Sequence, residues 1–346
     1  MNEVSTVDID FDVDLMASYL RSLLGNNDRL EVERTLGGMS NPTYFLRYGD
    51  WQAVLRKQPN GKVMPSAHAI DREFRVLSTL QNSAVPVPRP LHYCSNREII
   101  GTPFYLMERL EGRIFNEFSL PGLAREERTA LFTSMASTMA TIHRLNVNAL
   151  GLNDFGRPGN YFARQLKRWS EQWYTQYRKD DNDNPALDRL VTWLGERVPE
   201  SETLRLCHGD FRIGNVMFHP TEPRVVGVLD WELSTLGHPL VDVAFNSQAW
   251  RMAPDENGGL LGLPLTDLGI PEEKNYLEQY YFFADCTERM TPFHMAFAMF
   301  RGAVGSAGVA VRGEAGNGFL PDAARVGRKL ARAYAERGLA LTETSN

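Results

Sequence analysis

The sequence has few of the features that mark secreted, membrane-spanning or nucleic-acid-coating proteins. Its three cysteines, Cys94, Cys207 and Cys286, lie far apart without C-x-x-C spacing, which argues against a disulfide framework and favours reduced thiols in a cytoplasmic protein. The first residues, MNEVSTVDIDFDVD, are acidic and lack the basic segment and apolar core of a secretion signal. A net charge of −6 offers no general basic excess for collecting phosphates, so we expect no nucleic-acid partner.

Long uninterrupted apolar runs are also missing. The most apolar late stretch, MAFAMFRGAVGSAGVAV, is interrupted by Arg301 and by glycines, so it predicts a buried helix and no membrane partner. The overlapping glycine-rich stretch 308–319 is expected to form a loop. What remains is an ordinary globular composition, 43% apolar and 23% charged, whose 346 residues suggest two domains or one large bilobal domain.

The coarse pattern predicts an α+β protein with a small β-rich N-terminal half and a larger, mainly helical C-terminal half. Strands are expected over 30–36, 43–49, 51–58, 90–95 and 98–112, with further short strands within 204–240. Helices are expected over 14–24, 66–80 with Ser66 as its cap, 124–145, 160–178 and most of the chain from 272 onwards. The boundary falls near 108–112, which divides the chain into lobes 1–110 and 111–346.

A glutamate lies on the apolar face of the predicted helix 66–80. Stepping 100° per residue from Ile70 places Glu73 in the middle of the apolar arc, and a buried carboxylate is costly unless it is paired. The strand AVLRKQ offers Arg56 on one face and Lys57 on the other, and we favour Arg56 as the partner. Kinases position ATP phosphates with such a strand cation and helix glutamate. A surface helix with a loosely placed glutamate is the alternative.

The stretch HGDFRIGN, residues 208–215, contains several functional side chains within one turn. Asp210 and Asn215 are separated by four residues, and the following apolar run RVVGVLD ends in Asp230. Mg²⁺ prefers oxygen ligands, and a remaining aspartate can accept the proton of an attacking hydroxyl. A polar turn explains HGD alone, but the order of cation strand, glutamate helix, D-x4-N loop and strand-end aspartate is typical of kinases.

With these residues in this order, the chain resembles the aminoglycoside phosphotransferase, or choline-kinase-like, family, a branch of the protein-kinase fold. The resemblance covers about residues 30–330 and is most specific in CHGDFRIGNVMF and VVGVLDWELSTLGHPLVDVAF. Segments GGMSNPTYFL, VLRKQPNGKVMPSAHAIDREFRVL and GRPGNYFARQLKRW are similar to the kinase-like domain that some proteins carry fused to an acyl-CoA dehydrogenase. The resemblance implies a bilobal fold, with a small antiparallel sheet and one key helix in the N-lobe. It also implies ATP and Mg²⁺ as cofactors and a functional link to an acyl-CoA dehydrogenase.

The resemblance implies a role for each matching residue. Asp210 would be the catalytic base, and Asn215 and Asp230 would hold Mg²⁺. Arg56 stands where the family usually has a lysine, and Glu73 stands where the partner of that lysine lies. Because arginine presents a planar fork, the phosphate geometry is expected to differ from that of the lysine enzymes.

Further nucleotide contacts are implied on both sides of the ATP site. The loop 37–43, with Ser40 and Asn41, would cover the phosphates, although it lacks G-x-G-x-x-G spacing. The hinge that reads adenine would be 107–110, with Met107, Glu108 and Leu110.

Residues around the catalytic loop have predicted supporting parts. Arg212, two residues after Asp210, is expected to be a transition-state cation, with a surface arginine as the alternative. His208 is expected to pack and hydrogen-bond, since Asp210 already fills the role of base. Asp242, in HPLVDVAF, is expected to support the loop, and His143 to be a core histidine.

The acceptor is predicted to be a small-molecule hydroxyl bound in the helical half. In YFARQLKRWSEQWYTQYRK, Arg164, Lys167 and Arg168 can line one helix face beside Trp169, which favours an anionic acceptor such as a hydroxy acid or hydroxyacyl-CoA. A solvated basic face is equally compatible with this pattern. A kinase of a cationic substrate and a non-catalytic ATP-binding pseudokinase stay open, and the lack of an activation-loop segment disfavours a protein kinase.

Overall fold

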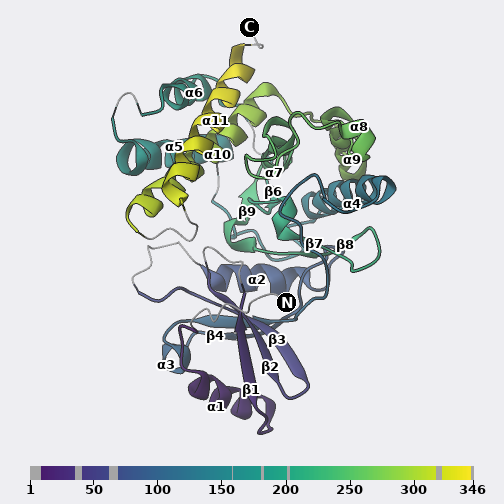
Figure 1. Cartoon of the computed structure of the whole chain (residues 1–346), viewed down its shortest axis with the longest axis vertical. Coiled ribbons are helices and arrows are strands. Elements are labelled where there is room, and N and C mark those ends of the chain that lie inside the picture. The colour runs from purple at the N-terminus through teal and green to yellow at the C-terminus, as the bar shows by residue number, and fades with distance from the viewer. Residues whose placement is uncertain are drawn as a thin grey trace. The chain divides into compact units, whose positions relative to one another are not determined.

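The protein is described by a computed structural model over residues 9–35, 41–61, 69–157, 159–180, 183–200, 203–316 and 322–343. The chain divides into two compact units, which we describe one at a time. Unit 1 comprises Met1–Gly112 and Val226–Glu232, and unit 2 comprises Arg113–Val225 and Leu233–Asn346. Unit 1 contains an antiparallel sheet and unit 2 is mainly helical, as the sequence predicts (Figure 1).

The sheet of unit 1 has five strands in the order β1-β2-β3-β5-β4. These are β1 Leu30–Arg34, β2 Thr43–Tyr48, β3 Trp51–Lys57, β4 Pro90–Cys94 and β5 Phe104–Met107. Strands β2 and β3 form a hairpin in which Tyr48 pairs with Trp51, so its turn has two residues. Gly49 has a φ of 59° in this turn, a conformation that glycine adopts without steric cost.

Three helices accompany the sheet: α1 Val13–Leu24, α2 Ile70–Leu80 and α3 Arg97–Ile100. In α1, the side chain of Asp12 caps the first turn, and Met16 and Leu20 are buried in a core shared with the sheet residues Leu46 and Leu106. That core explains why the amphipathic pattern predicts α1 well.

Two predicted boundaries in unit 1 are wrong. Helix α2 begins at Ile70 and its N-cap is Ala69, which has no side chain that can cap; Ser66, the predicted cap, lies outside the described residues. The predicted strand 98–112 begins with the short helix α3 and only its centre forms β5. Asn96 caps α3 and Gly101, with a φ of 82°, ends it, so local capping overrides the apolar run.

Unit 2 is built from helices and a few short strands. The longer helices are α4 Arg125–His143, α5 Tyr161–Gln172, α6 Pro185–Gly195, α7 Leu240–Ser247, α9 Glu273–Ala284, α10 Pro292–Glu314 and α11 Ala323–Glu343. The shorter ones are η1 Trp173–Tyr177, η2 Ile213–Asn215, η3 Trp231–Leu233 (which begins in unit 1), η4 Gln248–Arg251 and α8 Leu265–Leu268. The short strands of unit 2 are β6 Arg205–Cys207, β7 Val216–Phe218 and β9 Thr235–Gly237, of which β6 pairs with β9; strand β8 Val225–Val228 begins at the last residue of this stretch of unit 2 and continues in unit 1.

Helix α10 confirms the prediction of a buried helix but contradicts the loop predicted over 308–319. The helix continues to Glu314, and residues 317–319 lie outside the described part of the chain. Its glycines allow close packing instead of a turn: a Cβ on Gly308 would lie 3.0 Å from the ring of Tyr177, and one on Gly313 would lie 2.5 Å from the backbone nitrogen of Ala324. Glycine therefore has a packing role here that its usual loop preference hides.

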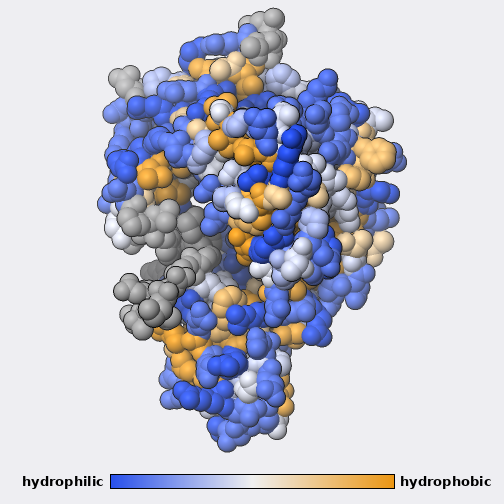
Figure 2. All heavy atoms as spheres, turned by 45° about the vertical axis from the view of Figure 1, so that its right-hand side comes forward, coloured by the Kyte–Doolittle hydropathy of each residue, from blue (hydrophilic) through white to orange (hydrophobic). Residues whose placement is uncertain are grey.

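The visible face of the molecule is mostly hydrophilic, with apolar atoms in smaller groups (Figure 2). Among the described residues, none of the helices is both long enough and apolar enough to cross a bilayer.

Candidate functional site

In unit 1, one buried arginine is shared by three carboxylates. Arg56 on β3 donates from Nε to Oε2 of Glu73 on α2 at 2.9 Å, and both side chains are almost completely buried. The same guanidinium pairs with Asp230 and lies 3.8 Å from Glu232. The predicted ion pair between strand and helix is therefore formed, and two acidic side chains from 226–232 join it.

Within the ion pairs found among the described residues, the single cation Arg56 contacts three acidic side chains. Burial raises the pKa of Glu73 above its ordinary value, and the neighbouring Arg56 only partly offsets this. Burial alone would lower the pKa of Arg56, but Glu73 and Asp230 outweigh it and raise that pKa. The side chains of Asp230 and Glu232 are 25% and 18% exposed, so neither carboxylate is completely removed from solvent.

Asp230 has a strained backbone. Its φ of 65° lies in the left-handed region, which non-glycine residues rarely adopt, at the end of the run that forms β8. Such strain is found more often at functional sites than elsewhere. It fits the prediction that this aspartate has a metal-binding role, which stays a prediction.

Two further residues were predicted to contact the nucleotide from the loop 37–43, Ser40 and Asn41. Asn41 is fully buried and donates from Nδ2 to Oε2 of Glu232 at 3.2 Å, while Ser40 lies outside the described residues. Lys57 points away from this cluster, as predicted, and its Nζ lies 3.0 Å from Asp10 and from Asn60.

The predicted hinge follows strand β5. Met107 is the last residue of β5, and Glu108 and Leu110 follow it outside regular structure. The backbone N–H of Glu108 donates to the carbonyl of Arg89 at 2.8 Å, which ties the segment to the start of β4. The adenine-reading role of 107–110 stays a prediction.

In unit 2, the predicted catalytic loop, 208–215, is held in a closed hydrogen-bond network. The carboxylate of Asp210 accepts from Nδ2 of Asn215 at 2.7 Å and from Nε of Arg212 at 3.5 Å. Nδ2 of Asn215 also donates to the backbone carbonyl of Asp210 at 2.9 Å. The residues predicted to be base, metal ligand and cation thus lie together on one short turn.

The side chain of Asp242 supports this loop by accepting hydrogen bonds from the loop's backbone. Its carboxylate accepts from the N–H groups of His208 at 2.6 Å and Gly209 at 2.9 Å, and from Nε2 of His143 at 3.3 Å. Burial alone would raise the pKa of Asp242, but these hydrogen bonds outweigh it and lower the pKa, so the residue stays ionised. Nδ1 of His208 accepts from the N–H of Asp210 at 3.2 Å, consistent with a supporting role.

The sequence reasoning missed Arg301 on α10. This arginine is 92% buried, donates from Nη2 to the carbonyl of Gly209 at 3.0 Å, and lies 5.6 Å from the ring centres of both Trp169 and Phe245. Its Nε and Nη1 have no hydrogen-bond partner among the described residues. The interruption of the apolar stretch MAFAMFRG by an arginine was the only signal in the sequence.

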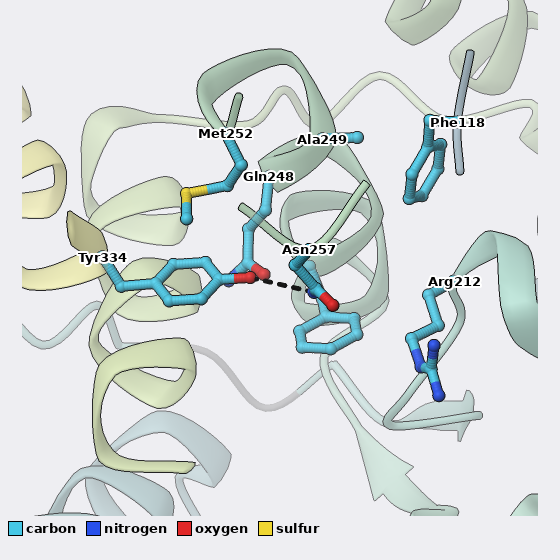
Figure 3. Close-up of a pocket in the computed structure, with 8 residues that line it drawn as sticks. Phe118, Arg212, Gln248, Ala249, Met252, Asn257 and Tyr334 are labelled. Atoms are coloured by element: carbon cyan, nitrogen blue, oxygen red, sulfur yellow. Dashed lines mark hydrogen bonds between the residues drawn. The ribbon is translucent and has the colours of Figure 1, made fainter. Parts of the chain in front are cut away.

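A pocket lies next to the catalytic loop within unit 2 (Figure 3). It is lined by Phe118, Arg212, Phe245, Gln248, Ala249, Met252, Asn257 and Tyr334, and it is partly open to solvent. Arg212 is the only charged side chain of the eight. Of this set, only Arg212 was predicted, because the others belong to no motif.

The loop after η4 closes one side of this pocket. Asn257 has a φ of 63° and Gly258 a φ of 68°, and a Cβ on Gly258 would lie 2.5 Å from the carbonyl oxygen of Asn116. The loop is tied to α11 by the ion pair between Glu256 and Arg337. The Asn-Gly pair is therefore required for the loop to fold against the pocket.

The predicted basic face of α5 is not part of this pocket. Arg168 is exposed, Arg164 donates to the carbonyl of Gly159, and Trp169 packs against the buried core and Arg301. The structure therefore places Arg164, Arg168 and Trp169 away from the pocket lining, and their role as substrate contacts stays a prediction.

A group of potential metal ligands in unit 2, His238, Glu288 and His294, is unsuited to a metal. Nδ1 of His238 accepts from a backbone N–H at 3.3 Å, and Nδ1 of His294 accepts from the N–H of Thr291 at 3.1 Å. Each neutral ring therefore carries its hydrogen on Nε2, which leaves no lone pair there for a metal.

Comparison with known proteins gives a consistent result. A profile of the phosphotransferase enzyme family matches residues 31–281. Acyl-CoA dehydrogenase family member 10 of Mus musculus is 41% identical over 335 residues, which cover 93% of this chain and 30% of that protein. Acyl-CoA dehydrogenase family member 11 of Rattus norvegicus is 46% identical over 240 residues, covering 68% of this chain and 30% of that protein. The chain thus spans less than a third of either relative.

Solved structures share the fold. A proposed aminoglycoside phosphotransferase from Ralstonia eutropha superimposes with a TM-score of 0.84 and 37% identity, over 97% of this chain and 99% of that one. Aminoglycoside phosphotransferase APH(4)-Ia, in complex with ADP and hygromycin B, superimposes with a TM-score of 0.61 over 93% and 98% of the two chains. At 18% identity, this second likeness shows the fold alone.

Proposed function

Since the chain belongs to the phosphotransferase enzyme family and is a small-molecule phosphotransferase, we propose that it uses ATP and Mg²⁺ to phosphorylate the hydroxyl of an anionic acceptor. Asp210 receives the hydroxyl and accepts its proton as the phosphoryl group is transferred. The acceptor is a hydroxy acid or a hydroxyacyl thioester such as a hydroxyacyl-CoA.

The observation that carries this proposal is the lining of the pocket beside Asp210. Five of its eight residues are apolar or aromatic, and its only charged group is the cation Arg212. A polycationic acceptor needs carboxylates to replace its hydration, and the lining includes none. An apolar chain with a carboxyl or thioester group meets complementary surfaces instead. The curated relatives named as acyl-CoA dehydrogenases support an acyl acceptor and a functional link to such a dehydrogenase.

The donor sets in both units fit ATP and Mg²⁺. In unit 2, the side-chain hydrogen bonds of Asn215 among the described residues use Nδ2, which leaves its Oδ1 as an oxygen ligand for a cation. In unit 1, Asp230 offers a carboxylate oxygen of the kind that Mg²⁺ prefers. When bound, Mg²⁺ neutralises phosphate charge. Arg56, oriented by Glu73, would bind phosphate oxygens through its planar fork. Arg212 would stabilise the negative charge that develops during transfer.

The test is ADP release in the presence of a panel of anionic hydroxy acids and hydroxyacyl thioesters and of cationic aminoglycosides and choline. We expect turnover with the anionic group, loss of turnover with EDTA, and a fall of roughly 10²-fold or more in Asp210→Asn. Glu171→Gln, on the exposed surface of α5, is the matched control and should behave like the wild type. Equal ADP release by wild type and Asp210→Asn would refute the role of Asp210, and turnover of aminoglycosides alone would refute the acceptor class.

A further inference from the structure

One polar group in the pocket lacks a partner. Gln248 is 95% buried on η4, and its Nε2 has no hydrogen-bond partner among the described residues. A buried amide that has lost water without gaining a partner is unfavourable, so folded proteins rarely retain one without a reason. Gln248 lines the pocket, so a bound molecule can supply the missing acceptor.

The neighbouring polar groups also offer hydrogens. Tyr334 accepts at its hydroxyl from Nδ2 of Asn257 at 3.2 Å, which leaves the hydroxyl hydrogen of Tyr334 available. Figure 3 shows the Gln248 side chain running toward the Tyr334 hydroxyl and Asn257, with Arg212 on another side of the pocket. Burial raises the pKa of Tyr334, so its hydroxyl stays protonated. This end of the pocket therefore offers two hydrogens, from Nε2 of Gln248 and the hydroxyl of Tyr334, beside the amide oxygens of Gln248 and Asn257.

The remaining walls are apolar. Phe118, Ala249 and Met252 line the pocket with 6%, 5% and 1% exposure, and each presents only apolar side-chain surface to it. A ligand that fits needs an oxygen acceptor at one end and an apolar chain beside it.

We propose that Gln248 is a specificity-determining residue whose Nε2 donates to the carbonyl or carboxyl oxygen of the acceptor molecule. The chain of that molecule lies along Phe118 and Met252, and its hydroxyl faces Asp210. This assignment rests on the proposed function, since it names the subsite that holds the acyl end of the same acceptor. It distinguishes hydroxyacyl compounds from simple alcohols, which have no oxygen at that position, and from diols, whose oxygen there brings its own hydrogen to a site that already presents donors.

The test compares binding of two probes that differ by a single carbonyl oxygen. Each ester is the methyl ester of a linear hydroxyhexanoic acid, and its ether is the methoxyhexanol with the hydroxyl at the same position. Several such pairs are tested, which differ in the position of the hydroxyl. Titration calorimetry with ADP and Mg²⁺ present measures affinity without turnover. We expect the wild type to bind at least one ester roughly tenfold more tightly than its ether, because the ether lacks the carbonyl oxygen that Nε2 of Gln248 would bind and keeps only the methoxy oxygen, which lies elsewhere in the molecule.

Two variants test whether the preference for ester over ether depends on the side chain of Gln248. Gln248→Leu removes the donor and should reduce the ratio of ester to ether affinity to about one. Gln248→Glu keeps the shape but presents only acceptors when ionised, so it should bind the ester more weakly than Gln248→Leu does. Glu171→Gln should retain the wild-type ratio. Unfolding midpoints of all variants show whether each is folded.

The outcomes separate this inference from the proposed function. Equal affinity for ester and ether in the wild type, no binding of either probe, or a preference that survives in both Gln248 variants would overturn it. ADP release with the preferred ester is measured in parallel. If the binding preference depends on Gln248 but no Asp210-dependent phosphorylation follows, the subsite stands and the phosphotransfer proposal fails.

Discussion

Single side chains hydrogen-bond to the backbone of the predicted catalytic loop, and Asp242 makes the largest number of these bonds. It is completely buried and ionised, and it accepts two loop N–H groups and a histidine. We expect Asp242→Asn to destabilise the protein by about 1–3 kcal/mol, because an amide cannot accept all three bonds without presenting a donor to one of them. Chemical unfolding measures this loss. A free energy of unfolding equal to that of the wild type would contradict the role given to the carboxylate.

Arg301 offers a different prediction, because it lacks a carboxylate partner among the hydrogen bonds and ion pairs of the described residues. Replacing a buried unpaired cation by a hydrocarbon of similar length costs little stability, so Arg301→Met should stay folded. The carbonyl of Gly209 loses its donor, and the loop that bears Asp210 loses a restraint. We therefore expect kcat to fall roughly tenfold while KM for ATP changes little.

The conservative replacement provides the control for that experiment. Arg301→Lys keeps a donor that can reach the Gly209 carbonyl, so it should recover most of kcat. A purely structural role predicts instead that both variants change the unfolding midpoint and leave kcat alone. Steady-state kinetics beside thermal unfolding distinguishes the two results.

At the scale of elements, the sequence predicts those features that depend on residues close together in the chain or on a regular spacing of residues. The β2–β3 hairpin follows from alternating residues around Gly49, and the pair of Arg56 and Glu73 follows from two periodicities, 2 for the strand and 3.6 for the helix. The predicted catalytic loop is contained within eight residues, so its members could be recognised together. The start of α2 could not be predicted, since its Ala69 cap has no capping side chain.

The pocket could not be predicted, because its lining residues are far apart in the sequence. Its lining comes from positions as distant as Phe118, Gln248 and Tyr334, and only the tertiary fold brings them together. No spacing rule links such residues. Gly308 and Gly313 were likewise misread, because their small size serves helix packing that depends on distant side chains.

Helix packing leads to a matched pair of glycine substitutions. A Cβ on Gly327 of α11 would lie 2.6 Å from the backbone nitrogen of Ala310 on α10, whereas a Cβ on Gly305 would have no atom within 4 Å. We expect Gly327→Ala to destabilise by about 1–3 kcal/mol through overpacking and Gly305→Ala to stabilise by roughly 0.5–1 kcal/mol through helix propensity. Denaturant titration of both variants tests the pair. A stabilising effect of Gly327→Ala would show that the two helices do not pack closely at Gly327.

At the scale of the whole molecule, the dependence of stability on acidity follows from buried histidines. Burial and the neighbouring His238 lower the pKa of His294 to about 4, against an ordinary value near 6.5. Between these two values the unfolded chain binds a proton that the folded chain does not. The free energy of unfolding therefore falls as the pH drops from about 6.5 to 4, by up to about 3 kcal/mol from this residue. Asp242, whose pKa is lowered, adds its own loss only below its ordinary value of 3.8.

The matched variant for this prediction is His294→Gln. Nδ1 of His294 accepts from the N–H of Thr291 in a capping box at the start of α10, and glutamine is a usual residue at that position of the motif. The variant should therefore keep the cap while removing the titrating group. We expect its free energy of unfolding to vary less between pH 6.5 and 4 than that of the wild type, measured by urea unfolding at several pH values. If both proteins lose stability equally over this window, another group is responsible for the acid sensitivity, with His238, buried beside the exposed carboxylate of Glu288, as the next residue to substitute.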